Sequence, residues 1–119
     1  MIISFAWTTP AFKARQKTVT RRDWSDEYAA KFHKYDVVEA YSRQTSFGGV
    51  PIGKILIKET PYREWSNLVP EIDFEKEGFL FLEMQKIKCG KLTPMQVWEQ
   101  WFDEPELLYV VRFEIIEVF

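Results

Sequence analysis

The segment from Leu107 to Val118 constrains the fold most, because it carries the longest strand pattern in the chain. Successive side chains of a strand point to opposite faces of a sheet. One face would carry Val110, Arg112 and Glu114, and the other Val111, Phe113 and Ile115. The apolar pair Ile115-Ile116 breaks this alternation, which predicts a β-bulge or a bend.

Three further segments are rich in β-branched or aromatic residues and predict strands at Ile2–Ala6, Val37–Tyr41 and Ile52–Lys58. The stretch Thr45–Gly49 joins the second of these to the third. Its two glycines predict a long hairpin loop with Phe47 at the tip.

Three Thr-Pro dipeptides, Thr9-Pro10, Thr60-Pro61 and Thr93-Pro94, each predict the start of a helix, with Thr as the N-cap and Pro in the first turn. The third is the best supported, because Gln96 completes a capping box. That helix should end before Pro105.

Two more helices are predicted, one from Ser25 through Lys34 and one from Pro70 into the eighties that Gly78 interrupts. We interpret the acids Glu71, Asp73 and Glu75 as a solvated face of the second. Together these elements predict a single α+β domain over residues 1–119, with a small mixed β-barrel and flanking helices.

The bulk properties narrow the functional classes. The only cysteine, Cys89, cannot form an internal disulfide, and no signal peptide or membrane span is evident, so we expect a cytoplasmic protein that does not enter a membrane. A formal net charge of −2 argues against a polybasic binder of long duplexes. We expect no metal and no cofactor, and a monomer or a weak homodimer.

A basic segment, Lys13 to Arg22, stands out from this acidic background. It contains five cations and no acid, and removing them leaves eleven Lys and Arg against eighteen Asp and Glu. In an extended strand Thr20 and Arg22 would share one face, and Lys17 would lie on the other unless the chain turned between them. Spacing alone leaves open whether these residues form a site or a solvated surface.

The order of several motifs resembles that of ASCH domains, which are relatives of the PUA fold. The stretch Lys17-Thr-Val-Thr-Arg-Arg22 is similar to their Lys-Thr-x-Thr-x-Arg signature. Three other stretches are similar to later family motifs: Lys34-Tyr-Asp-Val-Val38, Gly53-Lys-Ile-Leu-Ile57 and Glu77-Gly78. The resemblance runs from Phe5 to the final strand, with one departure: Arg15 stands where the family usually has glycine.

This resemblance implies a β-barrel with a basic cleft that binds RNA or a modified nucleoside. Small bacterial members are amidohydrolases that remove the acetyl group of N4-acetylcytidine with a lysine, a threonine and a glutamate. By motif position these catalytic roles fall on Lys17, Thr20 and Glu77. The expected substrate-binding residues are Arg22, Arg21 and Thr18, together with Trp7 and Phe47 as aromatic groups that could stack on a base.

Other functions stay open from sequence. The same cleft would serve a non-catalytic RNA-binding or nucleotide-binding module, or a ribonuclease of the ASCH type. A third alternative is a protein-interaction domain that uses its tryptophan-rich helix as the contact surface.

Overall fold

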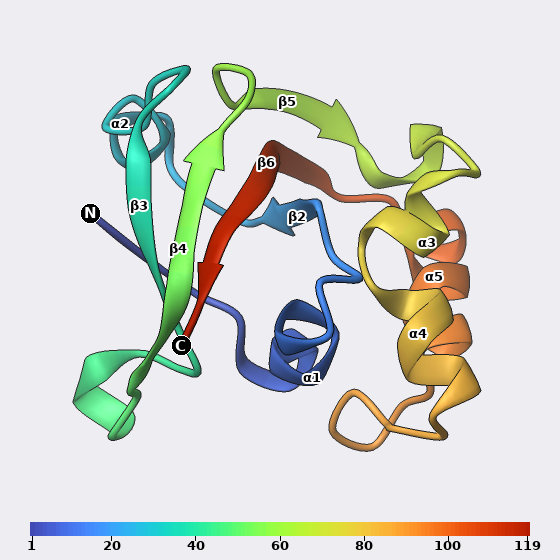
Figure 1. Ribbon diagram of the computed structural model, residues 1–119. Coiled ribbons are helices and arrows are strands. Elements are labelled where there is room, and N and C mark those ends of the chain that lie inside the picture. The colour runs from blue at the N-terminus through green and yellow to red at the C-terminus, as the bar shows by residue number, and fades with distance from the viewer.

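The computed structural model describes residues 1–119 and contains a six-stranded sheet flanked by helices (Figure 1). The strands are β1 (Ile2–Ser4), β2 (Val19–Arg22), β3 (Val37–Tyr41), β4 (Pro51–Ile57), β5 (Tyr62–Trp65) and β6 (Leu107–Val118). The helices are α1 (Thr9–Lys13), α2 (Asp26–Ala29), α3 (Asp73–Lys76), α4 (Phe79–Met84) and α5 (Pro94–Asp103), with short 3-10 turns at Ala6–Thr8, Thr45–Phe47 and Ser66–Leu68.

The sheet follows the order β1-β3-β4-β6-β2, with β5 also paired to β6. Strand β1 runs parallel to β3, and all the other pairs are antiparallel. The sheet curls into a half-barrel whose two end strands are β1 and β2 (Figure 1). The predicted α+β class, a small barrel-like mixed sheet with flanking helices, is therefore confirmed.

Strand β6 organises the sheet, as its sequence pattern predicted. Its first half pairs with β2 and β5, and its second half pairs with β4. Ile55 faces Ile115 and Lys54 faces Glu117, so Ile116 is the extra residue of a bulge. The predicted irregularity at Ile115-Ile116 is confirmed.

Two groups of apolar side chains hold the layers together. The barrel interior is filled by Ile3, Phe5, Phe12, Phe32, Val38, Ala40, Ile52, Ile55, Ile57, Val111 and Phe113. A second, aromatic cluster joins α3, α4 and α5 through Phe74, Phe79, Trp98 and Trp101. Helix α1 lies between the curled sheet and these three helices (Figure 1).

The helix predictions were right in part. The Thr93 capping box is present. Thr60-Pro61 starts no helix and instead precedes β5, where the missing N–H of Pro61 removes no bond from the sheet. Helix α1 begins at Thr9, so its N-cap is Thr8.

The helix predicted from Ser25 is much shorter than expected. Ser25 caps it by accepting a hydrogen bond from the Tyr28 N–H at 3.1 Å, but α2 ends at Ala29. The chain then turns through Tyr35, whose φ is +72°, to reach β3. No helix of the structure combines the length and the apolar character that crossing a membrane requires.

Candidate active site

A cavity of about 160 Å³ lies where the 3-10 turn Ala6–Thr8, β2 and the start of α4 meet. Six of the eight residues singled out in the sequence line it, namely Trp7, Lys17, Thr20, Arg21, Arg22 and Glu77. The remaining lining residues are Phe5, Ala6, Thr8, Phe79 and Trp101. Segments more than fifty positions apart in sequence thus meet at one point.

Lys17 reaches this cavity because α1 ends in a tight reversal. The Gln16 N–H donates to the Ala11 carbonyl at 2.8 Å and the Arg15 N–H donates to the Phe12 carbonyl at 2.9 Å, which is the Schellman pattern. Arg15 occupies the left-handed position of that motif, with φ of +59°. This turn lies before Lys17, at the junction between α1 and β2.

Glu77 is brought to Lys17 by a second reversal, at Gly78. Gly78 has φ of +88° and separates α3 from α4. A Cβ atom added there would lie 2.6 Å from the Ala11 Cβ, so only glycine allows α1 to approach this closely. The position therefore fixes the distance between the segments that carry Lys17 and Glu77.

Lys17 and Glu77 form a buried pair, with side chains exposed by only 1% and 3%. Lys17 Nζ donates to the Glu77 carbonyl oxygen at 2.8 Å and to Glu77 Oε1 at 3.1 Å. Burial lowers the pKa of Lys17 below its usual 10.5; Glu77 opposes this shift, and the neighbouring charges of Arg22 and Arg21 add to it. A tetrahedral nitrogen with two acceptors on Glu77 keeps one further position for another group.

Thr20 and Arg22 form a second pair in the cavity wall. Arg22 Nε donates to Thr20 Oγ1 at 3.1 Å, and the guanidinium lies 5.4 Å from the centre of the Phe5 ring. Burial lowers the pKa of Arg22 to about 10, so the group stays charged at neutral pH. Its two Nη groups form no ion pair and are free to donate to a ligand.

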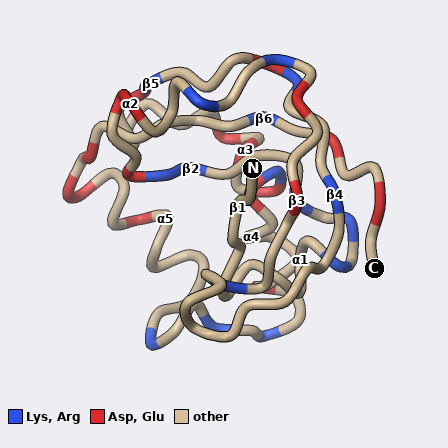
Figure 2. Tube along the Cα trace, turned by 90° about the vertical axis from the view of Figure 1, so that its left-hand side faces the viewer, with Lys and Arg blue, Asp and Glu red and all other residues tan.

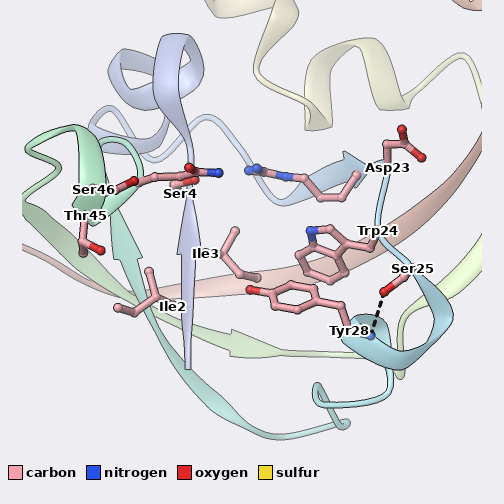
Figure 3. Close-up of a pocket in the computed structure, with 11 residues that line it drawn as sticks. Ile2, Ile3, Ser4, Asp23, Trp24, Ser25, Tyr28, Thr45 and Ser46 are labelled. Atoms are coloured by element: carbon pink, nitrogen blue, oxygen red, sulfur yellow. Dashed lines mark hydrogen bonds between the residues drawn. The ribbon is translucent and has the colours of Figure 1, made fainter.

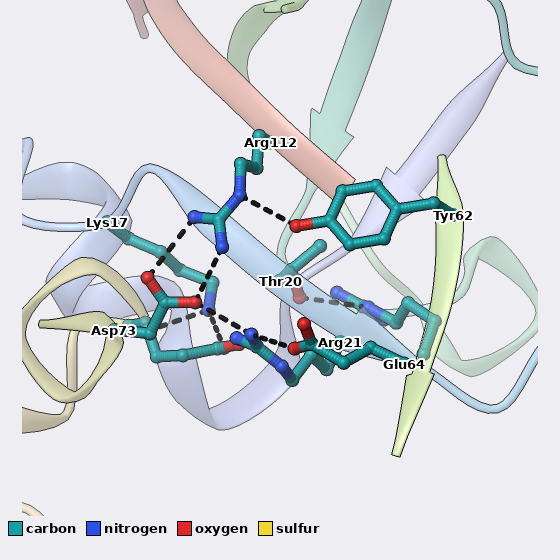
Figure 4. A network of polar contacts seen from close by, with 9 residues as sticks. Lys17, Thr20, Arg21, Tyr62, Glu64, Asp73 and Arg112 are labelled. Carbon is teal, nitrogen blue, oxygen red and sulfur yellow. Dashed lines mark hydrogen bonds and ion pairs between the residues drawn. The ribbon is translucent and has the colours of Figure 1, made fainter. Parts of the chain in front are cut away.

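Arg21 also lines the cavity, but its guanidinium belongs to a network of ion pairs (Figure 4). Its Nη1 donates to Glu77 Oε2 at 2.8 Å, and its Nη2 donates to Asp73 at 2.7 Å and to Glu64 at 3.1 Å. On the other side Asp73 accepts from Arg112 at 2.8 and 3.1 Å.

The interpretation of Asp73 as a solvated helix residue was therefore wrong. Its side chain is 1% exposed, because it lies at the start of α3 against β2 and β6. Burial alone would raise the pKa of Asp73, but hydrogen bonds from Arg112 and Arg21 outweigh that effect and hold it below 3.8. Arg112, a charged residue after the apolar run Leu107–Val111 of β6, was the sequence signal that could have identified this pair.

Aromatic side chains form the rest of the cavity wall. Trp7 stacks on Phe79 with ring centres 5.7 Å apart, and 36% of its surface stays exposed. Trp101, which the sequence did not single out for this site, lies 5.6 Å from the Arg21 guanidinium. A planar ligand would therefore meet aromatic groups on entering.

Two predicted site residues lie elsewhere. Thr18 has an exposed side chain and uses its backbone N–H to bond the Lys76 carbonyl at 2.8 Å. Phe47 is 69% exposed at the tip of its loop and does not line the cavity. Cys89, outside the cavity, is a poor nucleophile because burial raises the pKa of its thiol to about 12.

Comparisons with known proteins bear on the fold alone. No protein-family model matches the chain, and no curated protein sequence does. Among solved structures it is similar to the crystal structure of protein EF3133 from Enterococcus faecalis V583, described as DUF984, with a TM-score of 0.54. The two are 18% identical, and the match covers 96% of this chain and 72% of that one.

Proposed function

We propose that the protein is an ASCH-type domain that hydrolyses the amide of an acylated nucleoside such as N4-acetylcytidine. The observation that supports this most is the convergence of an amine, a hydroxyl, a carboxylate and a free guanidinium on one cavity, from Lys17, Thr20, Glu77 and Arg22. Amide hydrolysis needs a nucleophile, a base, an acid for the leaving amine and a donor for the oxyanion. The four groups supply these roles.

The roles follow from the contacts of each group. Thr20 Oγ1 attacks the acetyl carbonyl carbon, and its proton passes to the neutral amine of Lys17. Because Thr20 Oγ1 is bonded to Arg22 rather than to Lys17 in the free protein, a water or the bound substrate relays that proton. The guanidinium of Arg22 donates to the oxyanion.

The intermediate then collapses and the C–N bond breaks. Lys17, held by Glu77, returns the proton to the leaving N4 nitrogen and regenerates the amino group of cytidine. Water hydrolyses the acetyl ester left on Thr20, and Glu77 orients that water. The products are cytidine and acetate.

One observation favours a non-catalytic alternative. Both carboxylate oxygens of Glu77 already accept charged hydrogen bonds, from Lys17 and Arg21, which is also expected of a purely structural ion pair. In that case the cavity would bind a nucleotide through Arg22 and its aromatic wall without changing it.

Incubation with N4-acetylcytidine, with single-stranded RNA run in parallel, tests these alternatives. We expect cytidine and acetate to form, and Lys17→Ala, Thr20→Ala and Glu77→Gln each to lower the rate at least about 100-fold. Lys13→Ala and Glu75→Gln are matched controls, because both side chains are exposed outside the cavity, and these variants should keep the wild-type rate. Full activity in all three cavity variants would contradict the catalytic roles, and cleavage of the RNA would favour the ribonuclease.

A further inference from the structure

A second and larger cavity opens between the two end strands of the half-barrel (Figure 3). Its volume is about 590 Å³. It is lined by Ile2, Ile3, Ser4, Arg22, Asp23, Trp24, Ser25, Tyr28, Gln44, Thr45 and Ser46. Arg22 is the one residue that also lines the cavity of Lys17.

The sizes of the two cavities are complementary. Pockets that enclose a small molecule usually measure about 300–1,000 Å³. At about 160 Å³ the cavity of Lys17 falls below this range, so it holds only part of a nucleoside. At about 590 Å³ the second cavity falls within the range and has room for the part that remains.

The lining of the second cavity is suited to a sugar and a phosphate. Arg22 supplies a guanidinium whose Nε is bonded to Thr20. Of its two free Nη groups, one serves the oxyanion of the proposed reaction and the other is left to bind an anion in the second cavity. Hydroxyls of Ser4, Thr45 and Ser46 border it, and in Figure 3 the carboxylate of Asp23 points away from Ile3 and Trp24. One free cation with nearby hydroxyls matches a single phosphate.

The charge distribution limits the ligand to a short one. Outside the basic segment Lys13 to Arg22, Lys and Arg are scattered among Asp and Glu along the trace (Figure 2), and Asp23 follows directly after Arg22 of β2. Proteins that bind long nucleic acids neutralise many phosphates at once. A ligand with one bound phosphate is therefore favoured over a long strand.

We propose that the second cavity binds the ribose and the phosphate of a nucleotide whose acylated base occupies the cavity of Lys17, with Arg22 between the two. This inference rests on the proposed function and names its substrate class as a nucleoside monophosphate unit. The hydroxyls of Ser4, Thr45 and Ser46 lie at the far side of the cavity from Trp24 and meet the phosphate oxygens (Figure 3).

The test introduces a carboxylate into the second cavity without touching the first. Ser46 is exposed on its loop, so Ser46→Glu should fold, and Ser46→Gln is the neutral control of the same size. We expect Ser46→Glu to raise the KM for N4-acetylcytidine 5′-monophosphate about tenfold relative to Ser46→Gln. The KM for N4-acetylcytidine, which carries no phosphate, should be the same in both variants. Equal effects on the two substrates would overturn the inference and leave the proposed function in place.

A binding measurement separates the two proposals. Cytidine 5′-monophosphate, titrated into the wild-type protein, should shift the backbone amide NMR signals of Ser4, Thr45 and Ser46, and cytidine alone should not. If these shifts appear but the protein does not deacetylate N4-acetylcytidine, the second cavity is supported and the amidohydrolase is contradicted. Absence of shifts at these residues would overturn the inference.

An oligonucleotide distinguishes a free nucleotide from a strand. If only one phosphate is bound, a short single-stranded RNA containing cytidine should bind no more than about threefold more tightly than the mononucleotide, and log Kd should change with log salt with a slope of about 1 or less. A much steeper slope would show that several phosphates are bound and would overturn the single-phosphate site.

Discussion

Two groups of charged side chains meet at β2, and they differ in how completely their charges are paired. In the Asp73 network, formed by Asp73, Glu64, Arg21, Arg112 and Tyr62, every charged group has a charged partner, and Asp73 alone accepts from two arginines. In the cavity of Lys17 the pairing is incomplete, because the Nη groups of Arg22 and one position on Lys17 Nζ have no partner on the protein.

This difference separates a structural role from a binding role. A buried charge is tolerated when it is paired, and removing one partner leaves a costly isolated charge. In the Asp73 network every charged group is paired, and the one buried polar atom without a hydrogen-bond partner is Arg21 Nε. The incompletely paired groups keep donors for a ligand, and Glu77 connects both because its two carboxylate oxygens bond Lys17 and Arg21.

Asp73→Ala removes the central carboxylate of the fully paired Asp73 network and should have the largest effect on folding. It leaves Arg21 and Arg112 facing each other without their shared carboxylate, which should lower the free energy of unfolding by about 3–5 kcal/mol in urea titrations. Glu71→Ala removes an exposed acid from the same segment and should change it by less than about 0.5 kcal/mol. A loss below about 1 kcal/mol in Asp73→Ala would contradict the structural role.

Gly78→Ala tests the backbone position that brings the two groups together. The left-handed φ and the 2.6 Å approach to Ala11 both oppose a Cβ, so we expect a loss of about 2 kcal/mol in the free energy of unfolding. Thermal or urea unfolding measures it. Measured in an Ala11→Gly background, Gly78→Ala should cost less than in the wild type, because the contact is gone; an equal cost in both backgrounds would show that the contact is not the cause.

The pH dependence of the deacetylation rate tests the incompletely paired groups in the cavity of Lys17. Burial together with Arg22 and Arg21 lowers the pKa of Lys17, so the neutral amine that accepts a proton becomes the main form at a lower pH than in an ordinary lysine. The rate of deacetylation should therefore rise with pH and level off above the pKa of Lys17. In Arg22→Gln, loss of a neighbouring positive charge raises that pKa, so the rising limb should move to higher pH while the maximum rate falls. If the rising limb of Arg22→Gln stays at the wild-type pH, a group other than Lys17 controls the pH dependence of the rate.

Sequence patterns predicted the sheet better than the helices. Strand β6, its bulge and β3 follow from alternation of side chains, which is a local property. The short length of α2 could not be predicted in this way. The strand after Thr60-Pro61 was missed because the same Thr-Pro dipeptide fits both a helix start and an extended strand start. Tertiary contacts decide between them.

The site divides in a similar way. Lys17, Thr20 and Glu77 were found from a resemblance in motif order, and the structure brings them to one cavity. Asp73 and Arg112 were missed because each becomes recognisable only when β6 and α3 are placed together. Thr18 and Phe47 were named from their motif and loop positions, and neither position indicates the direction of a side chain.

Arg15→Gly tests the remaining departure from the resembled family and should have the smallest effect. Arg15 holds a left-handed φ of +59°, which costs a non-glycine residue about 1 kcal/mol or slightly more. Glycine removes that cost but adds freedom to the unfolded chain, so we expect a net gain of about 0.5 kcal/mol in the free energy of unfolding.

Arg15→Ala keeps the strained conformation and loses only a weak 3.4 Å bond to the Ile115 carbonyl, so it should show no gain. Equal stability changes in both variants would mean that the backbone is not strained there. Arg15 lies in the turn before Lys17 and does not contact the Asp73 network. Unchanged deacetylation in Arg15→Gly would therefore show that the turn places Lys17 equally well with either residue.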